Sequence, residues 1–238
     1  MIEVVDLSVR FGGVLPIDQM TVTFAHGTCG LIGPNGAGKT TFFNVLSGFV
    51  RPFDGRVVAF GDDLLAMADF KRPRWGLRRT FQTEQAIPNL SVYENVLLVH
   101  EHTGGDRRSA RDEVMRAVDF VGLAPDTDRL VEGLGAGQRR LVEIARAVVG
   151  QPRLVLLDEP AAGLPDEETV HLGELIRRIP AETGALVILV DHDMSLVSAC
   201  CDSTAVLDFG RLIASGVTAD VLRDEQVIRA YLGTEEVA

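Results

Sequence analysis

A glycine-rich segment near the N-terminus carries the residue types that hold phosphate groups. It reads Gly33-Pro34-Asn35-Gly36-Ala37-Gly38-Lys39-Thr40-Thr41 and contains the pattern G-x-x-x-x-G-K-T, which is typical of a phosphate-binding loop. Glycines allow such a loop to curl so that its N–H groups point inward at phosphate oxygens. We expect Lys39 to reach the β- and γ-phosphates of a nucleotide and the Thr40 hydroxyl to bind Mg²⁺.

The choice of lysine at this position supports the same interpretation. Lys39 and Lys71 are the two lysines of a chain that otherwise uses arginine for positive charge. An ammonium is a compact point charge, whereas a guanidinium is a broad planar fork. Residues 28–32 favour a short buried strand and residues 42–46 an apolar helix. This strand–loop–helix context favours a phosphate loop over the alternative, a glycine-rich turn with a chance lysine.

Two adjacent carboxylates follow a second apolar strand. Residues 154–157 read Leu-Val-Leu-Leu and lead directly into Asp158 and Glu159. A continuous apolar run is typical of a parallel strand buried on both faces, and such sheets bind ligands at the carboxyl ends of their strands. Asp158 is suited to holding Mg²⁺, and Glu159 to accepting a proton from an attacking water. A strand that simply emerges into solvent would explain either carboxylate alone, but not the pair beside a phosphate loop.

Four further features are weaker when taken singly. Phe11 could stack on a nucleotide base or fill one face of a sheet. Gln82 is a lone polar residue, and His192, after the apolar run 185–190, could contact a γ-phosphate or serve only as a cap. The run Leu134-Gly135-Ala136-Gly137-Gln138 precedes a helix with an apolar stripe. Its free N–H groups suit an anion, although an ordinary loop has the same composition.

The elements that must position these residues can be predicted from hydrophobic periodicity and turn signals. A Gly12-Gly13 turn joins two alternating segments and predicts an antiparallel sheet edge before the phosphate loop. A capping box, Ser91-x-x-Glu94, opens a helix, and a further helix follows from Ser109 to Val121. A last helix lies at 227–232. The segments that favour strands are 2–9, 20–24, 55–60, 154–157, 185–190, 204–207 and 211–214.

The expected fold class is therefore α/β, with one domain over residues 1–238. We expect a P-loop NTPase core with a mostly parallel sheet and flanking helices, an N-terminal antiparallel β subdomain and an inserted α-helical subdomain. Residues 84–149 look wholly helical and form the insertion. Residues 1–83 and 150–238 form the nucleotide-binding core.

Composition narrows the functional class. The formal net charge of −11 disfavours a nucleic-acid partner. The locally basic run 71–79 fits a solvated or docking surface better. No apolar run approaches the length that spans a bilayer, and the N-terminus does not resemble a signal peptide. We expect the three cysteines to be buried as small apolar residues and not to form a disulfide framework. Together these features predict a cytoplasmic chain.

The order of these motifs resembles the nucleotide-binding subunit of an ATP-binding cassette (ABC) transporter, over nearly the whole chain. The resemblance rests on the phosphate loop, Gln82, the run 134–138, the strand ending in Glu159, and His192. Several segments are most similar to the branched-chain amino acid uptake group, specifically to one of its two ATPase subunits. These segments are Arg79-Thr80-Phe81-Gln82, Glu159-Pro160-Ala161-Ala162-Gly163-Leu164, His192-Asp193-Met194 and Ile228-Arg229-Ala230-Tyr231-Leu232-Gly233.

The resemblance implies a head-to-tail dimer with ATP and Mg²⁺ between one subunit's phosphate loop and the other subunit's signature, here Leu134–Gln138. It implies that Phe11 stacks on adenine and that Gln82 couples Mg²⁺ and the attacking water to the membrane partner. Glu159 would be the general base, and His192 would hold the γ-phosphate. Thr40, Gln82 and Asp158 would be the Mg²⁺ residues.

The resemblance also implies partners. These are two transmembrane permease subunits, a second ATPase subunit and, indirectly, an extracytoplasmic solute-binding protein. We expect a heterodimer, with a homodimer as the alternative, peripheral on the inner face of the plasma membrane. We expect import of branched-chain or related amino acids, amides or urea. The alternatives are a lipopolysaccharide-type exporter, a soluble ABC ATPase of translation or DNA repair, and an ATP switch without useful turnover.

Two departures from the family pattern bear on activity. The usual signature is Leu-Ser-Gly-Gly-Gln, so Gly135 lacks the hydroxyl that would bond the partner's γ-phosphate. Losing one charge-assisted hydrogen bond costs about 1.5–3 kcal/mol, and we expect weaker closure over the ATP that this signature serves. The second departure is Pro165-Asp166, where an aspartate more commonly follows Leu164 directly.

Overall fold

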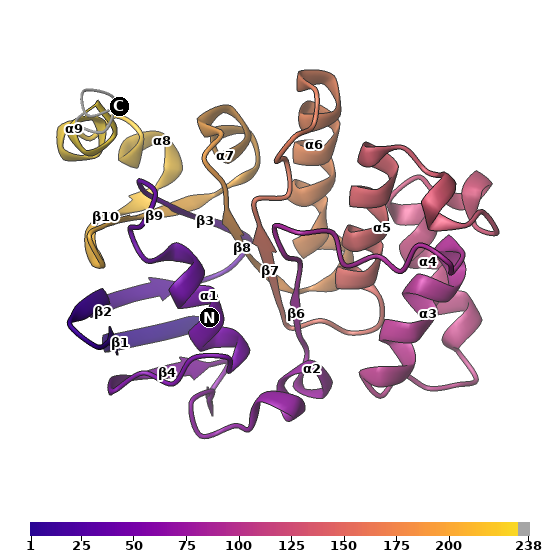
Figure 1. The fold of residues 1–238 in the computed structure, drawn as a ribbon, viewed down its shortest axis with the longest axis horizontal. Coiled ribbons are helices and arrows are strands. Elements are labelled where there is room, and N and C mark those ends of the chain that lie inside the picture. The colour runs from indigo at the N-terminus through magenta and orange to yellow at the C-terminus, as the bar shows by residue number, and fades with distance from the viewer. Residues whose placement is uncertain (233–238) are drawn as a thin grey trace.

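Two β-sheets form the framework of the chain (Figure 1). The computed structural model describes residues 1–232. The larger sheet has the strand order β10-β9-β3-β8-β7-β6 and is parallel except for β10. Strands β3, β7 and β8 are buried along their whole length, which explains their apolar sequences. The strand bounds are β3 Thr28–Ile32, β6 Leu77–Arg79, β7 Leu154–Asp158, β8 Leu186–Val190, β9 Ser203–Asp208 and β10 Arg211–Val217.

The smaller sheet is antiparallel and contains the N-terminus. Its order is β2-β1-β4-β5, with bounds β1 Ile2–Phe11, β2 Val14–Phe24, β4 Asp54–Ala59 and β5 Asp62–Asp63. The predicted turn at Gly12-Gly13 joins β1 and β2, and Gly12 has a left-handed φ of 58°. The expected α/β fold with an antiparallel N-terminal sheet is confirmed. The second strand begins earlier than predicted because Val14 already pairs with Phe11.

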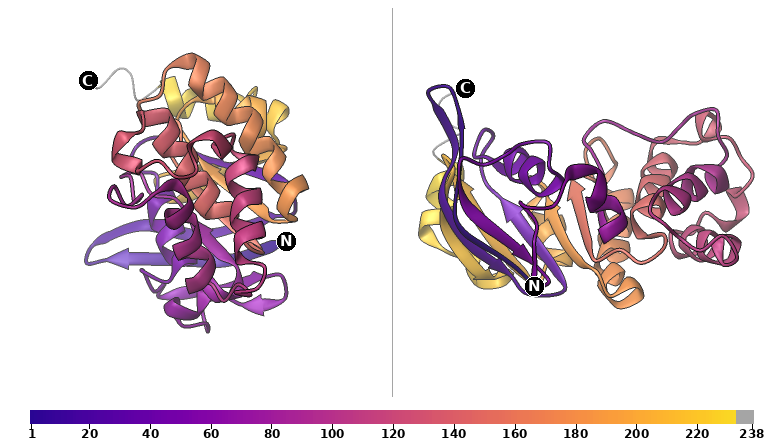
Figure 2. Two further views of the ribbon diagram at one scale, coloured as in Figure 1. Left: turned by 90° about the vertical axis from the view of Figure 1, so that its right-hand side faces the viewer. Right: turned by 90° about the horizontal axis from the view of Figure 1, so that it is seen from below.

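Helices flank both sheets and gather at one end of the molecule. Helices α3, α4 and α5 lie at the end opposite the antiparallel sheet (Figures 1 and 2). Among the described residues, no helix is long and apolar enough to cross a membrane. The α-helices are α1 Lys39–Ser47, α2 Arg72–Trp75, α3 Val92–His102, α4 Ala110–Phe120, α5 Ala136–Val148, α6 Asp166–Thr183, α7 Met194–Cys200, α8 Thr218–Val221 and α9 Glu225–Leu232, and the 3₁₀ turns are η1 Asp69–Lys71, η2 Ala124–Asp126 and η3 Val131–Gly133.

The helical segment after residue 84 begins as its sequence predicts. The Ser91 hydroxyl accepts the Glu94 amide at 3.2 Å, and the Glu94 carboxylate accepts the Ser91 amide at 2.8 Å, which completes the capping box. The Asn95 side chain, fully buried, bonds both the amide and the carbonyl of Ile87. One continuous hydrophobic cluster joins these helices to α6 and to strands β7 and β8. The helical segment is therefore packed firmly on the core.

Two features differ from the sequence expectations. The basic run 71–79 is not uniformly solvated, because Arg72, Arg78 and the Arg79 side chain are buried. Helix α6 was not predicted, although Leu172, Leu175, Ile176 and Ile179 form its buried face at helical spacing. The three cysteines are free and buried, as expected.

Candidate nucleotide site

The phosphate loop connects β3 to α1, and two glycines in it meet other backbone segments closely. Gly33 has φ 149° and Gly38 has φ 108°, both left-handed conformations that favour glycine. A Cβ atom would lie 2.1 Å from the Leu207 carbonyl oxygen at Gly33, and 2.1 Å from that of Pro16 at Gly38. The Gly210 amide also donates to the Ala37 carbonyl at 3.0 Å. The β9–β10 hairpin and β2 thus fix the shape of the loop from outside.

The same geometry leaves the start of α1 open to a ligand. The Phe42 amide donates to the Gly38 carbonyl at 2.9 Å, so the amides before it lie ahead of the first helical hydrogen bond. Asn35, Gly36 and Thr40 are exposed on this side. The loop therefore presents N–H donors and the positive end of a helix dipole, as an anion-binding loop requires.

Lys39 is buried and already points across the loop. Its Nζ donates to the Gly33 carbonyl at 2.6 Å and to the Pro34 carbonyl at 2.9 Å. Burial lowers the pKa of the Lys39 ammonium, and the nearby carboxylates of Glu159 and Asp158 oppose that shift. The structure thus brings the predicted lysine and the two predicted carboxylates together at the carboxyl ends of β3 and β7.

Asp158 ends β7 and is held by a residue that the sequence analysis left without a role. Its Oδ2 accepts from Arg79 at 2.8 Å, and both side chains are buried. Arg79 also donates to Asn44 at 2.8 Å and to Ser47 at 3.1 Å, both on α1. Burial raises the pKa of the Asp158 carboxyl, and Arg79 opposes the shift. The Asp158 Oδ1 is buried without a hydrogen-bond partner among the described residues, so one oxygen of this carboxylate is available for a further ligand.

Glu159 has an unusual backbone conformation. Its φ is 47°, a left-handed value that is uncommon for a non-glycine residue and is frequent at functional sites. The Glu159 amide donates to the Val190 carbonyl at 2.8 Å, which fixes the turn to the neighbouring strand β8. The side chain is partly exposed, so its carboxylate is accessible to a water molecule.

Phe11, Gln82 and His192 are exposed, and their predicted contacts with nucleotide stay predictions. Phe11 is 53% exposed at the end of β1, so it does not fill the face of a sheet. Gln82 lies in the loop after β6. The His192 side chain is 69% exposed beside Asp191, a buried carboxylate that accepts the amides of Asp193 and Ala161. All three side chains can meet a ligand without moving a packed core.

The signature residues Gly135, Ala136, Gly137 and Gln138 form the start of α5. Gly135 is the N-cap with no side-chain cap bond, and the Gln138 Oε1 accepts its amide at 3.3 Å. The Gln138 amide group in turn donates to Asp126 at 2.9 Å. Helices α1 and α5 lie apart in Figure 1. The chain therefore holds a phosphate loop and a signature that do not meet each other within the same subunit.

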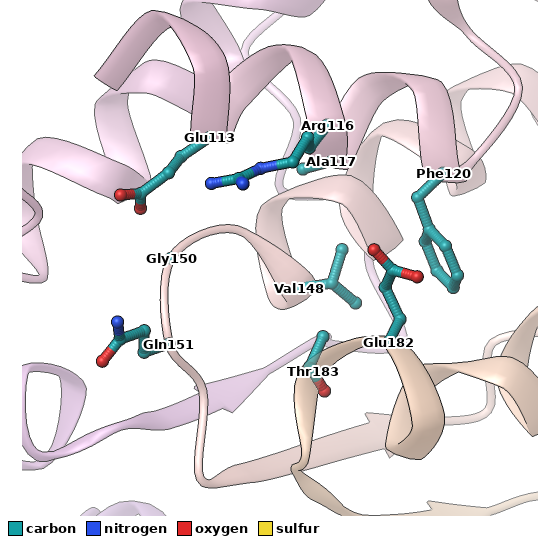
Figure 3. Close-up of a pocket in the computed structure, with 9 residues that line it drawn as sticks. All are labelled: Glu113, Arg116, Ala117, Phe120, Val148, Gly150, Gln151, Glu182 and Thr183. Carbon is teal, nitrogen blue, oxygen red and sulfur yellow. The ribbon is translucent and has the colours of Figure 1, made fainter. Parts of the chain in front are cut away.

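The cavity shown in Figure 3 lies away from these residues. It has a volume of about 260 Å³ and is bordered by Glu113 and Arg116 of α4, by Gly150 and by Glu182 near the end of α6. Its lining includes none of the predicted site residues. Several of the predicted site residues, among them Thr40, Gln82 and His192, are instead exposed at the surface.

The C-terminal helix also reaches the phosphate loop. Burial of the Tyr231 hydroxyl raises the pKa of this phenol to about 12, and its hydrogen-bonding contact with the Gly33 backbone opposes the shift. Val227 of the same helix is buried. The end of α9 therefore packs against the first glycine of the loop.

Comparison with known proteins agrees with this geometry. The profile of the ABC transporter family matches residues 17–162, and the profile of the branched-chain amino acid ATP-binding cassette transporter matches residues 211–237. The chain therefore belongs to the ABC transporter family, as an ATP-binding subunit with ATPase activity. Within that family it falls in the branched-chain amino acid group.

Individual relatives are similar over their full length. The high-affinity branched-chain amino acid transport ATP-binding proteins BraF of Pseudomonas aeruginosa and LivG of Escherichia coli K12 are each 36% identical to the chain, with 98% of both chains covered. The crystal structure of an ATP-binding cassette of an ABC transporter in its ADP conformation has a TM-score of 0.87 and 26% identity, with 98% of each chain covered.

Proposed function

We propose that this chain is the ATP-hydrolysing subunit of a membrane importer for branched-chain amino acids. The observation that supports this most is the predicted phosphate loop, with Lys39 beside Asp158 and Glu159, in a chain 36% identical to BraF and LivG over 98% of its length. We also propose that residues 84–149 form a helical subdomain that carries the signature.

Each residue of the proposed site has a separate role in ATP binding or hydrolysis. The loop amides and Lys39 bind the phosphates, and Glu159 accepts the proton of the attacking water, with Gln82 and His192 orienting the groups around it. Oxygen ligands suit Mg²⁺, and the free Asp158 Oδ1, the exposed Thr40 hydroxyl and Gln82 fit that ion. When bound, Mg²⁺ would neutralise charge on the β- and γ-phosphates. Phe11 would stack on adenine.

An aromatic groove beside Gln82 fits a membrane partner. Phe49 and Phe70 are 62% and 73% exposed, and both line a cavity of about 500 Å³ that also contains Phe81, the neighbour of Gln82. Exposed clusters of large apolar side chains mark protein interaction sites. We assign this groove to the permease, so that the chain is cytoplasmic and peripheral on the inner membrane face. The full assembly then has two permease subunits, a second ATPase subunit and an extracytoplasmic solute-binding protein.

Loss of this chain should abolish one uptake activity of its host. Cells lacking it are expected to lose uptake of radiolabelled leucine, isoleucine and valine, because the second ATPase subunit cannot form the two shared ATP sites without this chain. Reintroducing the wild-type chain should restore uptake, and Glu159→Gln should not. Unchanged uptake of all three amino acids in the deletion strain would overturn the assignment of the solute.

The altered signature predicts two unequal ATP sites in a heterodimer. The signature acts on the partner's ATP, so restoring a hydroxyl with Gly135→Ser should strengthen closure by about 1.5–3 kcal/mol. The measurement is single-turnover hydrolysis in heterodimers in which one subunit or the other lacks its general base. We expect the site closed by Gly135 to be the slower one and Gly135→Ser to speed it at least tenfold. Equal rates at both sites in the wild type would contradict this prediction.

A further inference from the structure

The loop that carries Gln82 is fixed to the core on its N-terminal side. The Thr80 amide donates to the Leu156 carbonyl at 2.9 Å, and the Thr80 hydroxyl accepts the Asp158 amide at 3.1 Å. Both partners belong to β7, the strand that ends in the carboxylates of the site. Residues up to Thr80 therefore move with the nucleotide-binding core.

The C-terminal side of the same loop is fixed to α5, the helix that begins with the signature. Glu143 Oε1 accepts the Gln85 amide at 2.6 Å. Arg146 donates to the Gln85 carbonyl. On the N-terminal side of Gln82, Arg140 donates to the Phe81 carbonyl at 3.4 Å. The exposed pair Arg139–Glu84 adds a surface contact at 2.9 Å. Residues on one side of α5 thus hold the backbone of the loop at several points.

Glu143 is the centre of these contacts. Its side chain is 4% exposed, and its Oε2 accepts from Arg140, which is 6% exposed, at 2.6 Å. Burial raises the pKa of the Glu143 carboxyl, and the Gln85 amide and the two arginines oppose that shift. A buried carboxylate is costly unless all its partners are present. The Glu143 carboxylate is therefore tolerated in this buried position because Gln85 and Arg140 are held at hydrogen-bond distance from it.

Gln82 lies between the two attachments. Both Gln82 and Thr83 are exposed, and they lie between Thr80, which is bonded to β7, and Gln85, which is bonded to Glu143. Residues 81–84 alone separate these two attachments, so we expect a shift of α5 relative to β7 to move Gln82. Through Glu143, the helix that presents the signature to one ATP is connected to the glutamine that acts on another.

We propose that Glu143 is a positioning residue for Gln82, which joins docking of the signature in one ATP site to placement of Gln82 in the other. This inference rests on the proposed function, because it requires two shared sites. The hydrogen bonds of the Glu143 carboxylate go to Gln85 and Arg140, neither of which is a predicted site residue. It acts through the Gln85 amide and the loop backbone.

Three substitutions test this role by steady-state ATP hydrolysis of the full chain with its partner ATPase subunit. Glu143→Ala should lower kcat at least tenfold and leave the KM for ATP within about twofold, because the phosphate loop is untouched while Gln82 is misplaced. Glu143→Gln keeps an acceptor for the Gln85 amide and should recover most of kcat. The matched control Glu101→Ala removes an exposed glutamate of α3, away from the loop, and should behave as wild type.

A second route removes the same hydrogen bond from the loop. Gln85→Pro removes the amide N–H that bonds Glu143 and leaves Glu143 paired with Arg140. It provides a second test in case thermal unfolding shows that Glu143→Ala is not folded. Wild-type kcat in a folded Glu143→Ala or Gln85→Pro variant would overturn the proposal, as would a rise in KM with kcat unchanged. A wild-type complex that hydrolyses no ATP would instead refute the proposed function.

Discussion

Replacing Glu159 with glutamine is expected to lower ATP turnover by about 10²- to 10⁴-fold while leaving ATP binding intact, because a positioned general base contributes that factor. The glutamine is nearly isosteric and cannot take a proton from water. The backbone of residue 159, held by the Val190 carbonyl at 2.8 Å, should be preserved. ATP should therefore accumulate in a closed dimer, measurable as phosphate release against nucleotide retained on a sizing column.

The matched control is Glu174→Gln, an exposed glutamate on the helix that follows the site. It changes the net charge equally and should turn over ATP as the wild type does. If Glu159→Gln hydrolysed ATP at the wild-type rate, another group would be the base and the assignment of Glu159 would be wrong.

Removing the Lys39 ammonium should have the largest effect on binding. Lys39→Ala deletes a charge-assisted contact to phosphate worth about 1.5–3 kcal/mol, so the Kd for ATP should rise roughly 10- to 150-fold. Lys39→Arg should not restore binding, because a planar guanidinium cannot replace a compact ammonium. The Lys39 Nζ lies 2.6 Å from the Gly33 carbonyl oxygen and 2.9 Å from that of Pro34. Isothermal titration with ATP gives the affinities.

The chain supplies its own control in Lys71, its other lysine, which is exposed outside the site. Lys71→Ala makes the same change in side chain and net charge, and it should leave the Kd for ATP unchanged. An unchanged Kd in Lys39→Ala would show that the loop amides alone bind the phosphates.

The sequence indicates candidate site residues more readily than the residues that support them. The phosphate loop and the carboxylates after β7 are local patterns whose spacing carries their chemistry. Arg79 was harder to interpret, since an arginine in a basic run looks solvated until its partners Asp158, Asn44 and Ser47 are known. Those partners are distant in sequence, and no local pattern identifies them. The same holds for Glu143, whose role depends on a loop far from it along the chain.

Strand β6 shows the same limit. It has three residues, two of them arginines, and is a strand only because it pairs with β7. Its propensity alone would not predict it. Helix α6 is a different case, because its buried leucines and isoleucines recur at helical spacing after Pro165 and so predict the helix without knowledge of distant partners.

The pairing of β3 has a consequence for how the protein is made. The phosphate loop is synthesised early, but β3 pairs with β8 and β9, and the loop rests on Leu207, Gly210 and Tyr231. All of these partners leave the ribosome late. A nascent chain therefore has no finished ATP site until the segment up to Tyr231 has been made, and products that terminate before it should not compete with intact subunits for nucleotide.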